Sequence, residues 1–484
     1  MKKATASFML ILCVLLLTHL NDAVQNFDVR RHLSTVSRYD FVKDVVDKNF
    51  VPSEIPDGCT PIHLNLVARH GTRAPTKKRM RELERLADHL EVLIREAKEK
   101  GSSLQKVPGW LQGWKSPWQG KLKGGELISK GEDELYDLGI RIREKYPDLF
   151  SEEYHPDVYP IKATQVPRAS ASAVAFGMGL FNERGTLGPG RHRAFAVTSE
   201  SRASDIKLRF HDCCDNYKEA SLLDITDQAC GLFSPSEVAL LEWTDDLEVF
   251  ILKGYGKSLN YRMGVPLLED IVQSMEQAIN AKEEKHTSGN YEKARLRFAH
   301  AETVIPFTCL LGLFLERSGE DLAITSLNSR VIFGRIKLFK TSFFLNELLN
   351  IVEFQQIQKE EPLALPPKPP QSRNWRGSIL APFTGNNMLV LYSCPANSSD
   401  KYFVQVLHNE HPTSMPGCNG TDFCPFDVFK ERIVAPHLKY DYNTLCNVQT
   451  EQAIHKSKTS KLSLLLRWLF PRWNDDTQSH KVEL

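Results

Sequence analysis

A histidine flanked by arginines, placed where a predicted strand meets a predicted helix, most constrains how this chain can fold. Residues 61–68 alternate polar and apolar side chains, which predicts a β-strand. Residues 69–76 then read Arg-His-Gly-Thr-Arg-Ala-Pro-Thr, and residues 76–101 repeat apolar side chains at helical spacing. Open α/β sheets bind ligands where a strand gives way to a helix. The pattern therefore predicts an α/β fold with a binding site at His70.

The residue types at this junction suit a phosphate dianion. Arg69 and Arg73 stand on either side of His70, and guanidinium groups match phosphate oxygens in charge and geometry. An imidazole held between them can attack phosphorus and become a transient phosphohistidine. For the octapeptide alone, the alternative is a basic loop with a surface histidine.

Two further junctions of the same kind follow along the chain. Residues 158–164 are predicted as a strand that precedes Arg168, and residues 294–298 as a strand that precedes His300 and Glu302. Loops that follow parallel strands meet at one edge of a sheet. We therefore expect these three side chains to lie close to the first junction.

Four segments resemble the histidine acid phosphatases. They are residues 69–76, the glycine-containing stretch 125–146, residues 163–173 around the third arginine, and residues 300–303. The last reads His-Ala-Glu-Thr where most of that family has His-Asp, which resembles the multiple inositol polyphosphate phosphatase branch, whose members act on phytate and related compounds. The similarity extends from about residue 59 to about residue 429.

This resemblance implies a role for each charged residue and no cofactor or metal. It implies that His70 is the nucleophile and that Glu302 is the proton donor. It also implies the side chains that bind the phosphoryl oxygens: Arg69, Arg73, Arg168 and His300. Arg168 could instead be an ordinary surface arginine, and Glu302 a helix N-terminal glutamate favoured by the helix dipole.

Lys77 and Lys78 follow the motif directly. They either extend the positive pocket towards further phosphates of the substrate or form the solvated face of a helix. The sequence leaves both interpretations open.

The expected function is that of a phosphomonoesterase that hydrolyses inositol polyphosphates such as phytate through a phosphohistidine. A broad-specificity acid phosphatase and a 2,3-bisphosphoglycerate phosphatase are the alternatives among enzymes. A binding protein of the secretory pathway that lost turnover is the alternative from another class. The expected partner is a small phosphorylated anion, since a net charge of +1 argues against a nucleic-acid partner.

The predicted architecture is an α/β core with a mostly parallel central sheet, flanked by helices and carrying a smaller inserted helical cap. Residues 55–200 and 291–460 are expected to form the core, and residues 193–199 to add a strand. Residues 201–290 are charged and poor in strand patterns, which predicts the cap, with residues 77–124 partly in it.

The two ends of the chain predict a secretory protein. Residues 1–23 have the charged start and short apolar run of a signal peptide. Residues 461–484 are expected to form a helix and a tail that ends Lys-Val-Glu-Leu, one substitution from an endoplasmic reticulum retention signal. Their apolar run is too short for stable membrane insertion. Either a retrieval receptor binds this tail or the match is a coincidence, so we expect location in the endoplasmic reticulum lumen or outside the cell.

Ten cysteines fit an oxidising compartment. Cys418 and Cys424 are close enough in sequence to close a small loop. One of Cys213 and Cys214 is expected to pair with Cys230. The family resemblance implies a further bridge between Cys59 and Cys394.

Two Asn-x-Ser/Thr sequons, at Asn397 and Asn419, predict glycosylated surface loops.

Overall fold

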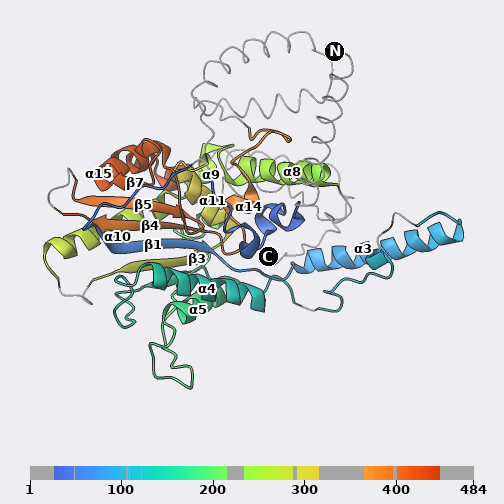
Figure 1. Cartoon of the computed structure of the whole chain (residues 1–484), viewed down its shortest axis with the longest axis horizontal. Coiled ribbons are helices and arrows are strands. Elements are labelled where there is room, and N and C mark those ends of the chain that lie inside the picture. Colours follow the sequence, from blue (N-terminus) through green and yellow to red (C-terminus); the bar gives the residue numbers. More distant parts are fainter. Residues whose placement is uncertain are drawn as a thin grey trace, which may run out of the picture.

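The computed structural model describes residues 27–446, except 48–49, 105–106, 108, 122, 215–233, 287–290, 315–364 and 396–399. The described strands form one sheet in the order β2-β3-β1-β4-β5-β6, with β7 paired to β5 (Figure 1). Their bounds are β1 Thr60–Arg69, β2 Ile161–Ala163, β3 Ala294–Ala299, β4 Asn386–Ser393, β5 Tyr402–His408, β6 His411–Pro412 and β7 Phe423–Pro425.

The sheet has a parallel and an antiparallel part. β3 lies between β1 and β2 and is parallel to both, whereas β4 is antiparallel to β1 and to β5. The α/β class is therefore confirmed, but the sheet is mixed and not mostly parallel. Its parallel part consists of the three strands that lead into the predicted junctions. The expected strand at residues 193–199 is wrong, because that stretch makes only a single bridge between Thr198 and Lys162.

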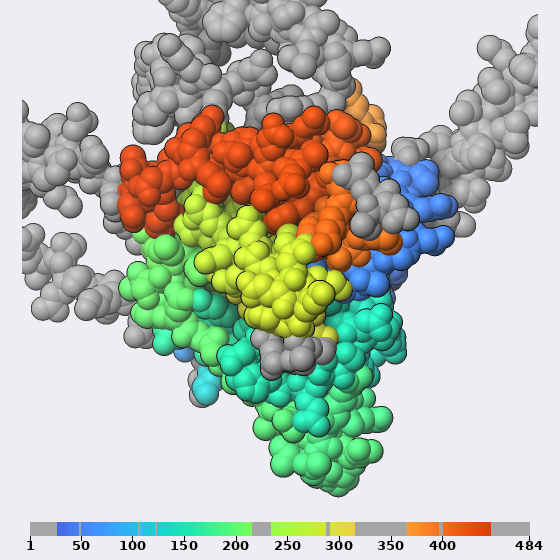
Figure 2. Space-filling model, turned by 90° about the vertical axis from the view of Figure 1, so that its left-hand side faces the viewer, coloured from blue at the N-terminus to red at the C-terminus, as the bar shows by residue number. Residues whose placement is uncertain are grey.

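Helices cover both faces of the sheet. In Figure 1, α4 and α5 lie below it. α10 and α11 cover the other face, where their buried side chains share a core with Val67 of β1 and Leu389 of β4. Figure 2 looks onto the end of the molecule opposite α3 and shows the last described residues, α10 and the α4–α5 layer stacked in that order. The helices are α2 Tyr39–Val42, α3 Lys77–Glu99, α4 Ser129–Lys145, α5 Pro167–Leu180, α6 Phe210–Cys213, α8 Pro235–Lys253, α9 Ser258–Arg262, α10 Val265–Glu283, α11 Ala301–Leu310, α14 Gly377–Leu380, α15 Phe426–Phe429, α16 Ala435–Leu438 and α17 Tyr442–Cys446. None of them has the length and apolar character that crossing a membrane requires.

Small residues bring α4 and α5 into close contact beneath the sheet. A Cβ added to Gly139 of α4 would overlap the Phe176 carbonyl oxygen of α5, and one added to Gly179 would overlap the Tyr136 carbonyl oxygen. The two helices therefore pack backbone against backbone. This packing places the N-terminus of α5, where Arg168 lies, firmly at the carboxyl end of β2.

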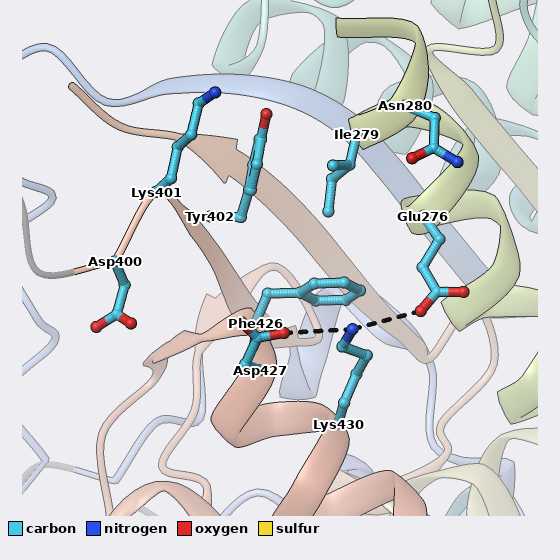
Figure 3. A pocket seen from close by; sticks show the side chains of 9 residues that line it. All are labelled: Glu276, Ile279, Asn280, Asp400, Lys401, Tyr402, Phe426, Asp427 and Lys430. Atoms are coloured by element: carbon cyan, nitrogen blue, oxygen red, sulfur yellow. Dashed lines mark hydrogen bonds and ion pairs between the residues drawn. The ribbon is translucent and has the colours of Figure 1, made fainter. Parts of the chain in front are cut away.

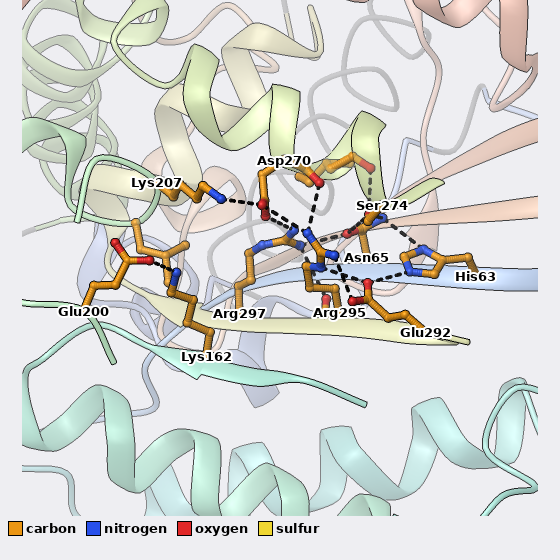
Figure 4. Close-up of polar contacts among 12 residues, drawn as sticks. His63, Asn65, Lys162, Glu200, Lys207, Asp270, Ser274, Glu292, Arg295 and Arg297 are labelled. Atoms are coloured by element: carbon orange, nitrogen blue, oxygen red, sulfur yellow. Dashed lines mark hydrogen bonds and ion pairs between the residues drawn. The ribbon is translucent and has the colours of Figure 1, made fainter. Parts of the chain in front are cut away.

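A buried polar network fixes α10 to the opposite face of the sheet (Figure 4). The Arg297 guanidinium of β3 donates to Asp270 Oδ2 of α10 at 2.5 Å and to Asn65 Oδ1 of β1 at 2.8 Å. Lys207 Nζ donates to the second oxygen of Asp270 at 2.6 Å. Buried charges need such partners, because removing an ion from water is costly. The part of segment 201–290 that forms α10 thus packs on the sheet, and the division into core and cap remains a prediction.

Three disulfides occur among the described residues. Cys59 is bonded to Cys394, as the family resemblance implied, and this bridge joins the start of β1 to the end of β4. Cys418 is bonded to Cys424, as expected.

The third bridge corrects a prediction. Cys214 is bonded to Cys446, 232 residues away, and not to Cys230. Spacing along the chain could not indicate this pair, since it depends on how α6 and α17 come together. Cys230 lies outside the described residues, so its pairing with Cys213 remains a prediction. Asn419 is exposed, as a glycosylated asparagine must be, whereas Asn397 lies outside the described residues.

Candidate active site

The carboxyl ends of the three parallel strands bring the predicted residues together. β1 ends directly before His70, and β3 ends directly before His300. The two imidazole centroids are 5.4 Å apart. β2 leads through Thr164 into α5, whose second residue is Arg168. The sequence-based expectation of one shared edge is therefore confirmed in geometry.

His70 is buried and has a defined tautomer. Its Nδ1 lies 2.9 Å from the Gly71 carbonyl oxygen, which can only accept, so Nδ1 carries the proton. Its Nε2 accepts from Arg168 Nε at 3.0 Å and therefore presents a lone pair. Burial first, and then the positive charge of Arg69, hold the pKa of His70 well below its usual range. The imidazole is thus neutral, and the lone pair of Nε2 points at an arginine.

Arg69 is anchored in the wall beside His70. Its Nη1 donates to the carbonyl oxygens of Thr35 and, at 2.7 Å, of Ala381, and its guanidinium lies 4.4 Å from the Phe383 ring centroid. Its Nε is buried without a hydrogen-bond partner among the described residues. Burial lowers the Arg69 pKa to about 9. Because the Arg69 guanidinium is buried and only partly hydrogen-bonded, an anion beside it would stabilise its charge.

Arg73 and Arg168 crowd the same space. Arg73 Nη1 donates to the Ala74 carbonyl oxygen at 3.0 Å, and its buried Nε has no partner among the described residues. Burial, followed by repulsion from Arg73, lowers the Arg168 pKa to about 10. Like charges held this close together are stabilised when an anion binds between them.

The loop that carries His70 is held by a buried carboxylate. Glu134 of α4 accepts from the Thr72 backbone N–H at 2.9 Å and from its hydroxyl at 2.8 Å. The same carboxylate accepts from the Thr384 hydroxyl at 3.2 Å. Gly71 and Gly131 touch backbone to backbone, and a Cβ on either would overlap the other segment. The His70 loop therefore has little freedom to move.

His300 faces His70 from the neighbouring strand. Its Nε2 accepts from Arg209 Nη1 at 3.1 Å and lies 2.9 Å from the Thr164 hydroxyl. Since the arginine N–H can only donate, the neutral His300 ring carries its proton on Nδ1. Burial holds the pKa of His300 well below its usual range. A neutral donor at this place suits a phosphoryl oxygen.

Glu302 lies in the first turn of α11 and pairs with a lysine. Its Oε1 is 3.1 Å from Lys253 Nζ, and 35% of its side chain is exposed. Burial disfavours the charged form, but Lys253, His211 and His300 outweigh it and hold the Glu302 pKa well below its usual range. Glu302 is therefore a carboxylate in the ligand-free protein.

Three residues of this site were missed by sequence reasoning: Arg209, His211 and Lys253. All belong to segment 201–290, which was interpreted as a cap without site residues. The ring of His211 lies 6.4 Å from that of His300, and its buried Nδ1 has no partner among the described residues. The Arg-Phe-His-Asp run at residues 209–212 was the available signal, but nothing in its spacing ties it to the strand ends.

Lys77 and Lys78 are exposed in the first turn of α3, which projects away from the sheet (Figure 1). Lys78 lines a hollow along α3 with Arg81, Glu82 and Asp88, and none of the strand-end residues contributes to it. The role expected for the two lysines remains a prediction.

A separate cavity of about 360 Å³ lies at the end of the sheet opposite His70, where β5 begins (Figure 3). Its Lys430 pairs with Glu276 at 3.4 Å and Asp427 at 3.3 Å, and Tyr402 and Phe426 supply its aromatic surface. Because these charges already neutralise each other, the cavity lacks the excess positive charge found around His70.

Comparison with known proteins agrees with this geometry. The family model described as "Histidine phosphatase superfamily (branch 2)" matches residues 62–229 and 223–409. The chain is 24% identical to "Multiple inositol polyphosphate phosphatase 1" of Dictyostelium discoideum, covering 83% of this chain and 70% of that protein. It is also 24% identical to the Homo sapiens protein of the same name, covering 78% and 81%.

A solved structure shares the fold. The phytase from D. castellii superimposes with a TM-score of 0.55 at 17% identity, covering 87% of this chain and 88% of that one. Because the family model matches well over half of the sequence, the chain belongs to branch 2 of the histidine phosphatase superfamily.

Proposed function

We propose that this protein is a phosphomonoesterase that hydrolyses inositol polyphosphates such as phytate through a phosphohistidine on His70. One observation carries the proposal: His70 Nε2 holds a lone pair that accepts from Arg168 Nε at 3.0 Å, while Nδ1 donates to the Gly71 carbonyl. A phosphoryl group that enters between His70 and Arg168 replaces the hydrogen bond between them. The Arg168 guanidinium is then free to bind phosphoryl oxygens.

In the first step, His70 Nε2 attacks phosphorus and the bond to the ester oxygen breaks. Arg69, Arg73 and Arg168 stabilise the negative charge on the phosphoryl oxygens, which is the main requirement of phosphoryl transfer. The leaving oxygen takes the bonding electron pair. It needs a proton, because an inositol alkoxide is a poor leaving group. Glu302 supplies that proton in its protonated form.

In the second step, water attacks the phosphohistidine. Glu302, now a carboxylate, accepts a proton from the water as its oxygen bonds to phosphorus. The P–N bond breaks, its electron pair returns to His70 Nε2, and inorganic phosphate leaves. The neutral imidazole is restored, which matches the low pKa of His70.

Two features support a highly charged substrate. Two relatives that are 24% identical over most of this chain are named multiple inositol polyphosphate phosphatases. In addition, Arg209 Nη1 reaches His300, so a fourth arginine borders the site beside the three of the proposed phosphoryl pocket. A polyphosphorylated ring can satisfy more of these cations than a simple monoester can.

Phosphate release by the purified protein tests the proposal. The substrates are phytate, 2,3-bisphosphoglycerate and p-nitrophenyl phosphate, with His70→Ala as the inactive control. We expect turnover of phytate with the highest kcat/KM. A higher kcat/KM for either of the other esters would identify that ester as the preferred substrate. Tight binding of phytate without turnover would instead identify a binding protein that lost catalysis.

We also propose that the protein resides in the secretory pathway and that a retrieval receptor binds its C-terminal tail. The disulfides among the described residues and the signal-like start of the sequence support this location. Deleting residues 481–484, which lie outside the described residues, should raise the secreted fraction of the protein. An unchanged distribution between cells and medium would mean that the tail is not recognised.

A further inference from the structure

Lys253, in segment 201–290, contacts Glu302, the candidate proton donor. It is the last residue of α8, and its Nζ lies 3.1 Å from Glu302 Oε1. The C-terminal end of a helix carries partial negative charge, which favours an ammonium group there. The side chains of Lys253 and Glu302 are 22% and 35% exposed, so the pair is partly shielded from water.

Other titratable groups also lie near Glu302, on several elements. They are His211 of α6, His300 after β3, Arg69 and Arg73 of the His70 loop, Arg168 of α5 and Arg209 before α6. Each of them, in its cationic form, favours the carboxylate form of Glu302. Lys253 differs from them because it makes the direct ion pair.

This pair conflicts with proton donation in the free protein. A carboxylate that is ionised and paired with an ammonium group has no proton to give. The proposed first step needs Glu302 in its acid form. The binding of substrate therefore has to change what surrounds Glu302.

We propose that Lys253 is a positioning residue that keeps Glu302 ionised in the free protein and releases it when a phosphate next to the scissile group binds the ammonium. This inference rests on the proposed function and deepens it. Lysine suits the exchange, because its ammonium is a point charge on a flexible stem. A phosphate with up to two negative charges is a stronger partner for that ammonium than one carboxylate.

The release of Lys253 converts Glu302 into an acid. Without the ammonium, and with phosphate charge nearby, its carboxylate takes up a proton from solvent. Glu302 then gives this proton to the ester oxygen as the P–O bond breaks and His70 Nε2 bonds to phosphorus. A substrate with neighbouring phosphates thereby activates its own proton donor, whereas a monoester of a simple alcohol does not.

Lys253→Met tests this exchange with two substrates, phytate and glycerol 2-phosphate. For glycerol 2-phosphate, kcat/KM reports the free enzyme, and its basic limb follows deprotonation of Glu302. Loss of the ammonium raises the Glu302 pKa, so this limb should move to higher pH by about one to three units. The preference for phytate over glycerol 2-phosphate at neutral pH should fall about tenfold or more, since each unit of pKa changes the protonated fraction about tenfold.

Two variants control for charge and folding. Lys257→Met removes an exposed lysine four residues further along and should move neither quantity. Lys253→Arg restores a cation and should return the basic limb towards its wild-type position. Thermal unfolding checks that each variant is folded.

The outcomes separate this inference from the proposed function. A wild-type protein that releases no phosphate from either ester would contradict the function itself. An active wild type whose Lys253→Met variant keeps both the basic limb and the substrate preference would overturn the role of Lys253 alone. Equal shifts in Lys257→Met would also overturn it, because the effect would then be one of general charge.

Discussion

The two walls of the site are built in different ways. The wall around His70 is held by backbone hydrogen bonds. The His70 N–H donates to the Ala299 carbonyl oxygen, and the His70 carbonyl oxygen accepts from the Thr384 N–H. The Thr72 backbone N–H in addition donates to the buried carboxylate of Glu134. The other wall is the end of α8 that carries Lys253, and it contacts Glu302 through the Lys253 side chain.

This difference separates a fixed from an adjustable part of the site. Backbone hydrogen bonds and close glycine contacts leave one geometry, which suits a nucleophile that must face phosphorus along one line. Long side chains can change partners at small cost. The proposed nucleophile, His70, thus lies on the rigid wall, and the proposed proton donor, Glu302, faces the wall that can respond to substrate.

Glu302→Gln is expected to have the largest effect, and only where the leaving group needs a proton. Phosphorylation of His70 by phytate should slow by about two to four orders of magnitude, the usual size of general-acid effects. Phosphorylation by p-nitrophenyl phosphate should change little, because nitrophenolate leaves unaided. A rapid-quench burst with each ester measures this step. Equal losses for both esters would assign Glu302 to structure.

Arg168→Ala should come next and should not discriminate between esters. Arg168 Nε donates to Nε2 of His70, and one lost donor to a developing charge costs about two to three orders of magnitude in kcat. Steady-state kcat for phytate and p-nitrophenyl phosphate measures the effect. A loss confined to phytate would mean that Arg168 acts on the leaving group, which would contradict its assignment to the rigid wall.

Gly131→Ala probes the rigid wall through its packing. The added methyl group overlaps the backbone at Thr72, so the loop or α4 has to shift. Forced shifts in tight packing cost about 1–3 kcal/mol, which thermal unfolding can detect. We expect kcat to fall with stability, because His70 moves with its loop. Ser102→Ala, on an exposed residue after α3, is the control and should change neither. Full stability in Gly131→Ala would show that the wall is less rigid than its contacts indicate.

The sequence predicted the rigid wall well, because that wall is local. The alternating residues 61–68 became β1, and residues 294–298 became β3, each ending directly before its histidine. His70, Arg168 and His300 could be placed together because parallel strands end at one edge.

The adjustable wall could not be predicted, because it depends on long-range packing. Lys253 meets Glu302 only after α8 and α11 pack, and Cys214 meets Cys446 only after α6 and α17 do. Neither contact leaves a periodic signal. The antiparallel half of the sheet was underestimated for a related reason: a pairing direction is set by connections and not by strand composition.

The central claim is that His70 carries the phosphoryl group during turnover, and trapping that intermediate tests it most directly. The protein is mixed with phytate, quenched in alkali within milliseconds, digested and analysed by mass spectrometry, since phosphohistidine survives alkali. We predict a phosphoryl group on the peptide that contains His70, and none in His70→Ala. Phosphate release by the wild type without any phosphorylated peptide, or phytate turnover by His70→Ala, would contradict the account.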